Sequence, residues 1–380
     1  MEFNLPRATE EHASDCEGRA SGQVAPRGAS DLIVPVILSG GGGTRLWPFS
    51  TKEMPKQFLP LINSKTLFSE ALERVANRSQ FAAPIVVGSV AHAELCGQAV
   101  LREGSDARLI LEPCARNTAP AVIMAAAVAR DTHGDDAMIL VMPSDHVIKD
   151  VGMFHEAILT GVAAARSGRL VTFGIKPNAP DTGYGYLQMG NDLLGAPHVK
   201  EVERFVEKPQ LEVAQAMVES GDYLWNAGIF LFRASALLDE ARRTCPAIAD
   251  AALTALAAGS VEGVRIIPDA GHFTSCPADS IDYAIMERSA NVAVVPMSPG
   301  WSDLGSWDAL AAMVGLSSAI GPITTVDCES CYIHSDGVEV AALGVRDLII
   351  VASGQRLLIV PRGRSQEVKK LLSAMDSMAA

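Results

Sequence analysis

A glycine-rich segment with two nearby cations is the first feature of the sequence that could do chemistry. Residues 38–50 read LSGGGGTRLWPFS, and KEMPKQF follows at 52–58. Glycines allow backbone angles closed to other residues and leave their N–H groups open to an anion. Arg45 adds a planar fork of donors for phosphate oxygens, and Lys56 adds a compact positive charge. The pattern predicts a phosphate-binding loop, although a flexible turn between a strand and a helix would explain the glycines alone.

This loop matches neither of two common nucleotide-binding motifs. No Gly-Lys-Ser/Thr follows at the spacing of a Walker A loop. The sixth position counted from Gly40 is Arg45, where the dinucleotide fingerprint needs glycine. Both classes are therefore set aside.

Two aspartates follow apolar runs that suit buried strands. Asp145 lies in MPSDH after the run 138–142, and Asp303 lies in GWSDLGSW after the run 292–295. Ligands bind beyond the carboxyl ends of strands in α/β sheets, and Mg²⁺ prefers oxygen ligands such as carboxylates. Each aspartate alone could instead shape a turn or cap a helix. Since His146 offers nitrogen, we interpret it as a hydrogen-bonding neighbour and not as a metal ligand.

Three further segments, TGYGYL, FVEKP and WNAGIF, carry groups that can pair with hydroxyls and with a phosphate. Glu207 can accept protons from two hydroxyls, and Lys208 can meet a phosphate. Because neighbours on a regular strand point to opposite faces, this pair requires a local irregularity. A surface Glu-Lys pair, a Gly-Tyr turn and a capping Asn are the alternatives.

Together these segments resemble a known family. G-G-x-G-T-R-L-x-P followed by P-K-Q is similar to the signature of the sugar-nucleotide pyrophosphorylases. EPCARNTAPA at 112–121 is similar to a segment of the mannose-1-phosphate guanylyltransferases within that family. The similarity runs from about residue 33 to the end of the chain and includes SIDYAIMERS at 280–289, DLIIVAS and RSQEVKKL.

The resemblance implies roles for individual residues. It assigns the metal to Asp145 and Asp303, and catalysis to these two aspartates with Arg45 and Lys56. The nucleotide is assigned to Gly41, Gly43, Thr44, Arg45, Lys56, Glu112 and Asn117. The sugar phosphate is assigned to the backbone at Gly185 and to Tyr186 as a wall, with Glu207, Lys208 and Asn226.

Glu112 is the residue that indicates GTP. Guanine presents N1–H and N2–H₂ donors on one edge, and one carboxylate could accept both. Thymine, uracil or adenine would present at least one mismatched acceptor or gap. A structural carboxylate beside Arg116 is the alternative interpretation.

The resemblance therefore implies a Mg²⁺-dependent transferase that joins GTP and α-D-mannose 1-phosphate into GDP-mannose and releases diphosphate. A transferase for another sugar 1-phosphate or base, and a non-catalytic paralogue that binds sugar nucleotides, are the alternatives. A homodimer is a family expectation. Many bacterial relatives continue into a cupin domain with phosphomannose isomerase activity, and this chain stops before such a domain, so no isomerase activity is expected.

The elements that must position these residues alternate between strand-like and helix-like segments. Apolar runs too short for helices occur at 32–38, 85–87, 138–142, 170–173 and 292–295, and helical patterns occur at 66–78, 153–166 and 211–219. This alternation predicts an α/β fold with a mostly parallel sheet. With the resemblance, it predicts a Rossmann-like, doubly wound nucleotidyltransferase domain over residues 31–318.

The pattern changes near residue 320 to short β-like runs, followed by a helical pattern near 365–375. We expect a small C-terminal unit at 319–380, for which a few rungs of a β-helix and an ordinary small sheet both fit. Residues 1–30 are polar and have neither the apolar core of a signal peptide nor the Arg-rich bias of a transit peptide. They are expected to form a disordered extension.

Composition excludes several classes of partner. The net charge of −13 would repel nucleic acid and anionic membranes, and the longest apolar runs fall short of the roughly 20 residues that a membrane helix needs. Seven cysteines are an odd number, which suits a reducing cytoplasm better than a disulfide framework. The CxxC at Cys328 and Cys331 has no partner pair, so two small core residues are expected.

Overall fold

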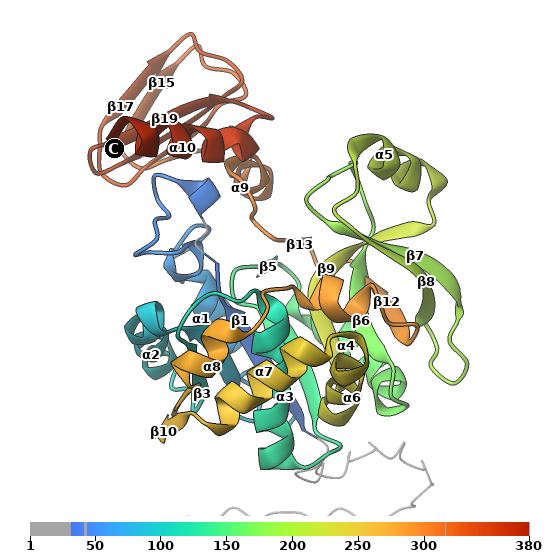
Figure 1. Cartoon of the computed structure of the whole chain (residues 1–380). Helices are drawn as coiled ribbons and strands as arrows, with labels where there is room; N and C mark the ends of the chain where they lie inside the picture. Colours follow the sequence, from blue (N-terminus) through green and yellow to red (C-terminus); the bar gives the residue numbers. More distant parts are fainter. Residues whose placement is uncertain (1–31, 42–43, 316, 380) are drawn as a thin grey trace, which may run out of the picture.

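The protein consists of a large α/β unit and a smaller β unit that packs beside its phosphate loop (Figure 1). The computed structural model describes residues 32–41, 44–315 and 317–379. The predicted N-terminal extension and Gly43 of the predicted loop lie outside these residues. Within them, no helix is both long and apolar enough to cross a membrane.

The main sheet contains all five apolar runs that the sequence predicts as strands. In the described part of the chain it has eleven strands, in the order β10-β11-β3-β2-β1-β4-β9-β6-β12-β8-β7. The strands are β1 (Ile33–Ser39), β2 (Ile85–Ser89), β3 (Arg108–Glu112), β4 (Met138–Pro143), β6 (Leu170–Ile175), β7 (Gly185–Asp192), β8 (Lys200–Glu207), β9 (Tyr223–Arg233), β10 (Ser260–Glu262), β11 (Arg265–Ile267) and β12 (Val292–Met297).

The sheet is mixed, which refines the expectation of a mostly parallel one. Strands β11, β3, β2, β1 and β4 run parallel, and β6 is parallel to β12. Strand β9 lies antiparallel between β4 and β6, and β8 and β7 continue antiparallel to the edge. An apolar run that is buried on both faces shows no alternation, so its direction is set by the connections and not by its own pattern. The doubly wound α/β architecture is confirmed.

Helices cover both faces of this sheet. Residues Val34 and Val36 of β1 face one core, while Ile33 and Ile37 face the other, as the alternation of a strand requires. The first core is covered by α3 (Thr118–His133), α6 (Ala234–Thr244), α7 (Pro246–Ala257) and α8 (Ala270–Ser275). The second is covered by α1 (Leu67–Glu73), α2 (Ala93–Arg102) and α4 (Val151–Arg166), while α5 (Leu211–Ser220) packs on β9 near β7.

The C-terminal unit has the strand pairing of β-helix rungs. Strands β14 and β18 both pair in parallel with β16, and β15 pairs in parallel with β17, while β19 returns antiparallel to β18. Of the two forms that the sequence left open, the rung arrangement is the one adopted. The strands are β14 (Ala319–Ile320), β15 (Ile323–Val326), β16 (Tyr332–Ser335), β17 (Val340–Leu343), β18 (Leu348–Ser353) and β19 (Arg356–Pro361), followed by η6 (Ser365–Glu367) and α10 (Val368–Ala379).

The CxxC pair lies between these rungs. Cys331 is buried and Cys328 is half-buried, and both thiols are free. Each thiol donates to backbone carbonyls of neighbouring rungs. Cys331 is thus the small core residue that the sequence predicts, whereas Cys328 is not part of the core.

A buried tryptophan joins the two units. Trp307 begins α9 (Trp307–Val314), is fully buried, and donates its indole N–H to the carbonyl of Trp47 at 2.9 Å. Its ring lies edge-on to Phe49 and contacts Tyr332 of the β unit, with centroids 5.6 and 6.1 Å apart. The indole therefore links the segment after the phosphate loop to β16 of the C-terminal unit.

We predict that Trp307→Ala destabilises the protein by about 3–5 kcal/mol, because it leaves a cavity at the junction and an unpaired carbonyl at Trp47. The free energy of unfolding, measured by urea denaturation, should fall accordingly. Leu194→Ala is the control, since Leu194 is fully exposed and should leave stability unchanged. Equal stabilities for the two variants would contradict this account of the junction.

Candidate active site

The predicted phosphate and metal residues line one cavity at the carboxyl ends of β1, β4 and β12. Its volume is about 340 Å³, and its lining includes Gly41, Thr44, Arg45, Lys56, Asp145 and Asp303. Gly41 has a φ of +85°, which favours glycine, and Thr44 and Arg45 lie in the short helix η2 (Thr44–Leu46). The structure thus brings these six predicted residues to one cavity.

A short ladder brings the two aspartates together. Strand β5 (Val147–Ile148) pairs antiparallel with β13 (Trp301–Ser302), so that Val147 lies opposite Ser302. Asp145 precedes β5 and Asp303 follows β13. The segments after β4 and β12 therefore meet above the sheet, although more than 150 residues separate them in the chain.

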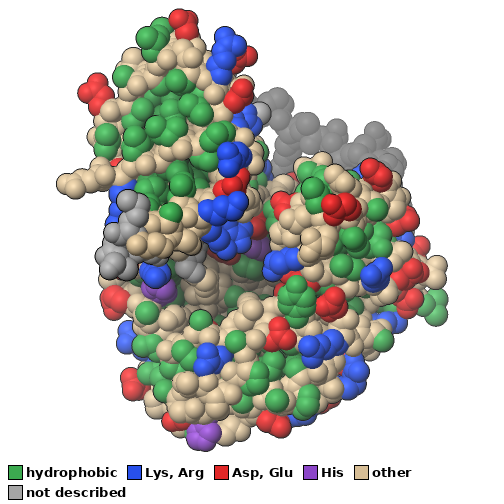
Figure 2. All heavy atoms as spheres, turned by 45° about the horizontal axis from the view of Figure 1, so that its top comes forward, with side chains coloured by type: hydrophobic (Ala, Val, Ile, Leu, Met, Phe, Trp, Pro, Cys, Tyr) green, Lys and Arg blue, Asp and Glu red, His purple; other side chains and the backbone are tan. Residues whose placement is uncertain are grey.

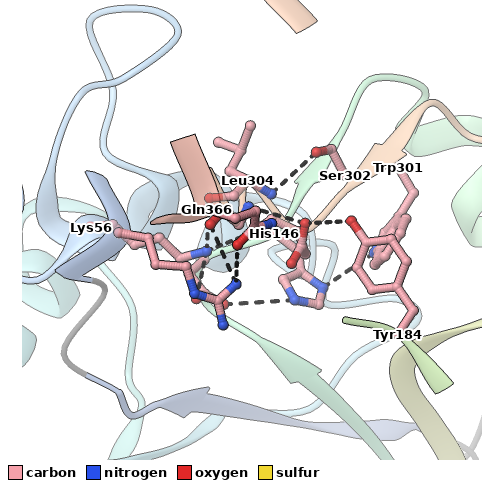
Figure 3. A network of polar contacts seen from close by, with 11 residues as sticks. Lys56, His146, Tyr184, Trp301, Ser302, Leu304 and Gln366 are labelled. Atoms are coloured by element: carbon pink, nitrogen blue, oxygen red, sulfur yellow. Dashed lines mark hydrogen bonds and ion pairs between the residues drawn. The ribbon is translucent and has the colours of Figure 1, made fainter. Parts of the chain in front are cut away.

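Lys56 is the cation that ties these segments together. It begins η3 (Lys56–Phe58), is 8% exposed, and places its Nζ 3.0 Å from Asp145 Oδ2. The same Nζ donates to the carbonyls of Asp303 at 2.5 Å and Leu304 at 3.4 Å. The ammonium is thus fixed between both aspartate segments (Figure 3).

The electrostatics of the pocket keep Asp145 ionised and His146 neutral. Burial would raise the pKa of Asp145, but the Lys56 ammonium, the neighbouring His146 and a backbone hydrogen bond together outweigh it, so the pKa lies below its usual value. Burial lowers the pKa of His146. Trp301 Nε1 donates to His146 Nδ1 at 3.2 Å, which leaves the ring hydrogen on Nε2. His146 is therefore a hydrogen-bonding neighbour, as the sequence suggests.

Asp303 is oriented by a tyrosine that the sequence analysis missed. Asp303 Oδ1 accepts from Tyr184 Oη at 2.8 Å and from the N–H of Gly305 at 3.0 Å. The Tyr184 ring lies between Trp225 and Trp301, with centroids 4.9 and 5.5 Å away, and its burial raises the pKa of the phenol. Tyr184 therefore stays protonated and able to donate (Figure 3).

Tyr186, which was expected to form a pocket wall, does not reach the pocket. Its side chain is fully buried in a cluster with Ala214, Met217 and Trp225, and its hydroxyl donates to the carbonyl of Asp181. Two tyrosines stand two positions apart in TGYGYL, and β7 begins only at Gly185. Since Tyr184 precedes the strand, regular alternation does not apply to it, and the sequence offered no basis for choosing between the two.

The predicted sugar-binding residues gather at the end of the β7–β8 ladder. Gly185 lies opposite Glu207, and a Cβ at Gly185 would lie 2.5 Å from Glu207 Oε2. Lys208 has a φ of +49°, which turns its side chain back to bring Nζ within 2.9 Å of Glu207 Oε1. The local irregularity required by the sequence is present, and it places both charges on the same side.

A further carboxylate, Asp282, faces these residues. It begins η5 (Asp282–Met286), and its Oδ1 accepts from Asn226 Nδ2 at 2.8 Å. Asn226 Oδ1 in turn accepts from Thr172 Oγ1 at 2.8 Å. Burial, together with the nearby Glu207 charge, raises the pKa of Asp282 to about 7. Asp282 lies in SIDYAIMERS, a segment that the sequence analysis uses only as part of the resemblance to the family.

Glu112 ends β3 with a buried carboxyl oxygen. Oε1 has no hydrogen-bond partner within the described residues, and burial raises the Glu112 pKa to about 8. Arg116 donates to the carbonyls of Ala115 and Thr274, and the described residues contain no Arg116–Glu112 ion pair. Asn117, with a φ of +65°, caps α3 by accepting from the N–H of Thr118.

The carboxylates of Asp145 and Asp303 form a donor set that fits a hard divalent cation. Within the described residues, no group of three or more His, Cys, Asp or Glu side chains could hold a metal ion. Two carboxylates suffice for a cation that keeps several waters and shares substrate phosphate oxygens. Arg45 Nη1, which donates to the Gly305 carbonyl at 3.4 Å, lies beside them.

Comparisons with known proteins agree with this division into two units. The profile of the nucleotidyl transferase family matches residues 34–315, and that of a mannose-phosphate isomerase/GMP-like β-helix domain matches residues 321–375. The xanthan biosynthesis protein XanB of Xanthomonas campestris is 43% identical over 91% of this chain and 73% of its own length. Mannose-1-phosphate guanylyltransferase of Klebsiella pneumoniae is 42% identical over 89% of this chain and 73% of its own length.

A solved structure has the same fold over most of this chain. A protein from Thermus thermophilus, described as a mannose-1-phosphate geranyltransferase, is 30% identical to this chain. The match has a TM-score of 0.80 and covers 91% of this chain and 99% of the other. The shared fold therefore includes both the α/β unit and most of the C-terminal unit.

We predict that Lys56→Met destabilises the protein by about 3 kcal/mol, because it leaves the Asp145 carboxylate enclosed without its counter-ion. Urea denaturation in the presence of a chelator should detect the change. The double variant Lys56→Met/Asp145→Asn should be more stable than the sum of the two single losses implies, since it removes both charges. Strict additivity would show that the pair does not interact.

Proposed function

Because the chain belongs to the nucleotidyl transferase family, we propose that it is a mannose-1-phosphate guanylyltransferase, which converts GTP and α-D-mannose 1-phosphate into GDP-mannose and diphosphate. The observation that carries this proposal is the joint placement of Asp145, Asp303, Arg45 and Lys56 around one cavity. Relatives at about 40% identity over most of the chain carry this activity in their names.

The chemistry is a displacement at phosphorus that needs no protein nucleophile. An oxygen of the sugar phosphate forms a bond to the α-phosphorus of GTP, and the bond from that phosphorus to the bridging oxygen of the β-phosphate breaks. The diphosphate leaves with the electron pair. The protein contributes positioning and electrostatic stabilisation, which dominate phosphoryl-type transfers.

Asp145 and Asp303 would hold Mg²⁺. Bound there, the ion would offset negative charge on the phosphates. Tyr184 and the N–H of Gly305 fix the orientation of one Asp303 oxygen, and Lys56 fixes one Asp145 oxygen. Each carboxylate thereby keeps its second oxygen for a ligand. Arg45, at the edge of the glycine loop, can donate to the phosphates as a planar fork.

The sugar and base pockets follow from the remaining groups. Glu207 and Asn226 offer acceptors and donors to sugar hydroxyls, and Lys208 offers an ammonium to the sugar phosphate. Gly185 leaves room beside Glu207 because it has no side chain. Glu112 supplies a buried carboxyl, and its Oε1, which lacks a hydrogen-bond partner among the described residues, can accept from the donor edge of guanine.

The test is release of diphosphate by the purified protein with GTP and Mg²⁺, comparing mannose 1-phosphate with glucose 1-phosphate and repeating the assay after chelation. Release that requires mannose 1-phosphate and metal is the expected result. Release with a different sugar phosphate would reassign the substrate. If no sugar phosphate leads to release of diphosphate and GDP-mannose still binds, a non-catalytic protein would be favoured.

We predict that Asp145→Asn and Asp303→Asn each lower kcat on the order of a hundredfold or more, because each removes a charge that holds the metal near the phosphates. Steady-state assays across a range of Mg²⁺ concentrations provide the measurement. Asp106→Asn is the matched control, since Asp106 lies on the surface and pairs only with Arg78 in the described structure. Near-normal turnover in either site variant would contradict the metal assignment.

A second prediction concerns Glu112 and pH. With a pKa of about 8, the free protein holds Glu112 mostly protonated at pH 7, whereas accepting both guanine donors needs the carboxylate. GTP binding should therefore release a proton, and the KM for GTP should fall as pH rises from 7 to 8.5, by up to about tenfold per unit below the pKa.

Glu112→Gln should raise the KM for GTP about tenfold or more and flatten its pH dependence, while the KM for mannose 1-phosphate stays unchanged. The variant separates titration of Glu112 from titration of the nucleotide. A pH dependence that persists in Glu112→Gln would remove Glu112 from base recognition.

A further inference from the structure

One wall of the active-site cavity belongs to the C-terminal unit. Lys369 of α10 lines the same cavity as Asp145 and Asp303. One turn earlier, Gln366 Oε1 accepts from Arg45 Nη1 at 3.4 Å. Figure 2 shows the hollow between the two units with Lys and Arg side chains along its rim, and Figure 3 shows Gln366 within the active-site network. The last helix of the chain therefore reaches the phosphate loop.

The start of this helix is anchored independently of any ligand. The N–H of Ser365 donates to Asp308 Oδ2 at 3.0 Å, and Ser365 Oγ accepts from the N–H of Asp308 at 2.9 Å. The N–H of Gly363 donates to the other oxygen of Asp308 at 2.8 Å. Val368 is fully buried among residues of both units. These contacts set the position of Lys369 before substrate arrives.

The other lysine of the cavity is already engaged by protein groups, so Lys369 is the lysine that can bind a ligand. Lys56 is committed to Asp145 and to two carbonyls, so its ammonium has little capacity left for a phosphate. On the outer side of the helix, Lys370 and Arg364 both pair with Glu367. Lys369 forms no ion pair within the described residues, and its side chain is exposed to the cavity.

A nucleoside triphosphate brings its β- and γ-phosphates into a cavity that already contains two aspartates. Cations at its open side would offset that charge, and an ammonium with three donors suits phosphate oxygens in any orientation. Arg45 and Lys369 are the two lining cations that carry no carboxylate partner within the described residues.

We propose that Lys369 binds the β- and γ-phosphates of GTP, and the diphosphate formed from them, so that the C-terminal unit supplies a substrate-binding residue to the active site of the α/β unit. This inference rests on the proposed function. It predicts that the C-terminal unit acts on the nucleotide and diphosphate and leaves mannose 1-phosphate binding unchanged.

The experiment compares Lys369→Ala and Lys369→Arg with Lys370→Ala, a neighbour on the same helix that lies outside the lining of the cavity. For Lys369→Ala, we expect the KM for GTP, and in the reverse direction the KM for diphosphate, to rise about tenfold, because one charge-assisted contact is lost. The KM for mannose 1-phosphate should change less than twofold, and Lys369→Arg should recover most of the loss.

Thermal unfolding and equilibrium binding of GTP without sugar phosphate complete the test. Because Lys369 is exposed, the midpoint of unfolding should match that of the wild type in every variant. Kinetics for Lys369→Ala that equal those of Lys370→Ala would overturn the proposal, and so would a loss for both substrates alike. If the wild type turns over no sugar phosphate, the proposed function fails, and unchanged GTP affinity in Lys369→Ala would then overturn this inference separately.

Discussion

The ammonium of Lys56 is the interaction on which the rest of the site depends. It faces the carboxylate of Asp145 and the carbonyls of Asp303 and Leu304, so one positive charge joins segments from three regions of the chain. Two aspartates beside one cavity would otherwise repel each other in a partly desolvated space. The lysine reduces that repulsion and fixes one oxygen of Asp145. A residue that the sequence suggests as a phosphate ligand is thus first a structural counter-ion of Asp145.

Most of the site could be predicted because its chemistry restricts the residue type. A loop that wraps phosphate needs glycines and cations, and a magnesium site at a strand end needs carboxylates, so Arg45, Asp145 and Asp303 stand out in the sequence. The strands before these residues could be predicted from the length of the apolar runs, since about four to eight apolar residues between breakers are too few for a typical helix. The sequence does not predict that β9 runs antiparallel to β4 and β6. A strand that is apolar on both faces has the same pattern whether it pairs in parallel or antiparallel.

The residues that the sequence analysis missed lie in segments of irregular backbone. Tyr184 lies just before β7, and Asp282 begins a π-helical turn, so neither follows the periodicity that identifies a facing side chain. Lys208 was assigned to the sugar phosphate together with a requirement for some local irregularity, which its positive φ supplies. Glu112 and Asp282 also share a property that no pattern reveals. Both are buried carboxyls with raised pKa values, and both lie where a ligand could bring hydrogen-bond donors.

The two-residue ladder of β5 and β13 has a consequence for which changes of chain length the protein can accept. Trp301 pairs with Ile148 and Ser302 with Val147, and Asp303 follows at once. An insertion or deletion of a single residue between Met297 and Trp301 would shift this pairing by one position and turn Asp303 to the opposite face. The tip of the β7–β8 hairpin at Leu194 is under no such constraint, since Leu194 is fully exposed, whereas Ala196 and Val199 beyond it are buried. A change of length should therefore be accepted at that tip, while the segment before Trp301 keeps a constant number of residues.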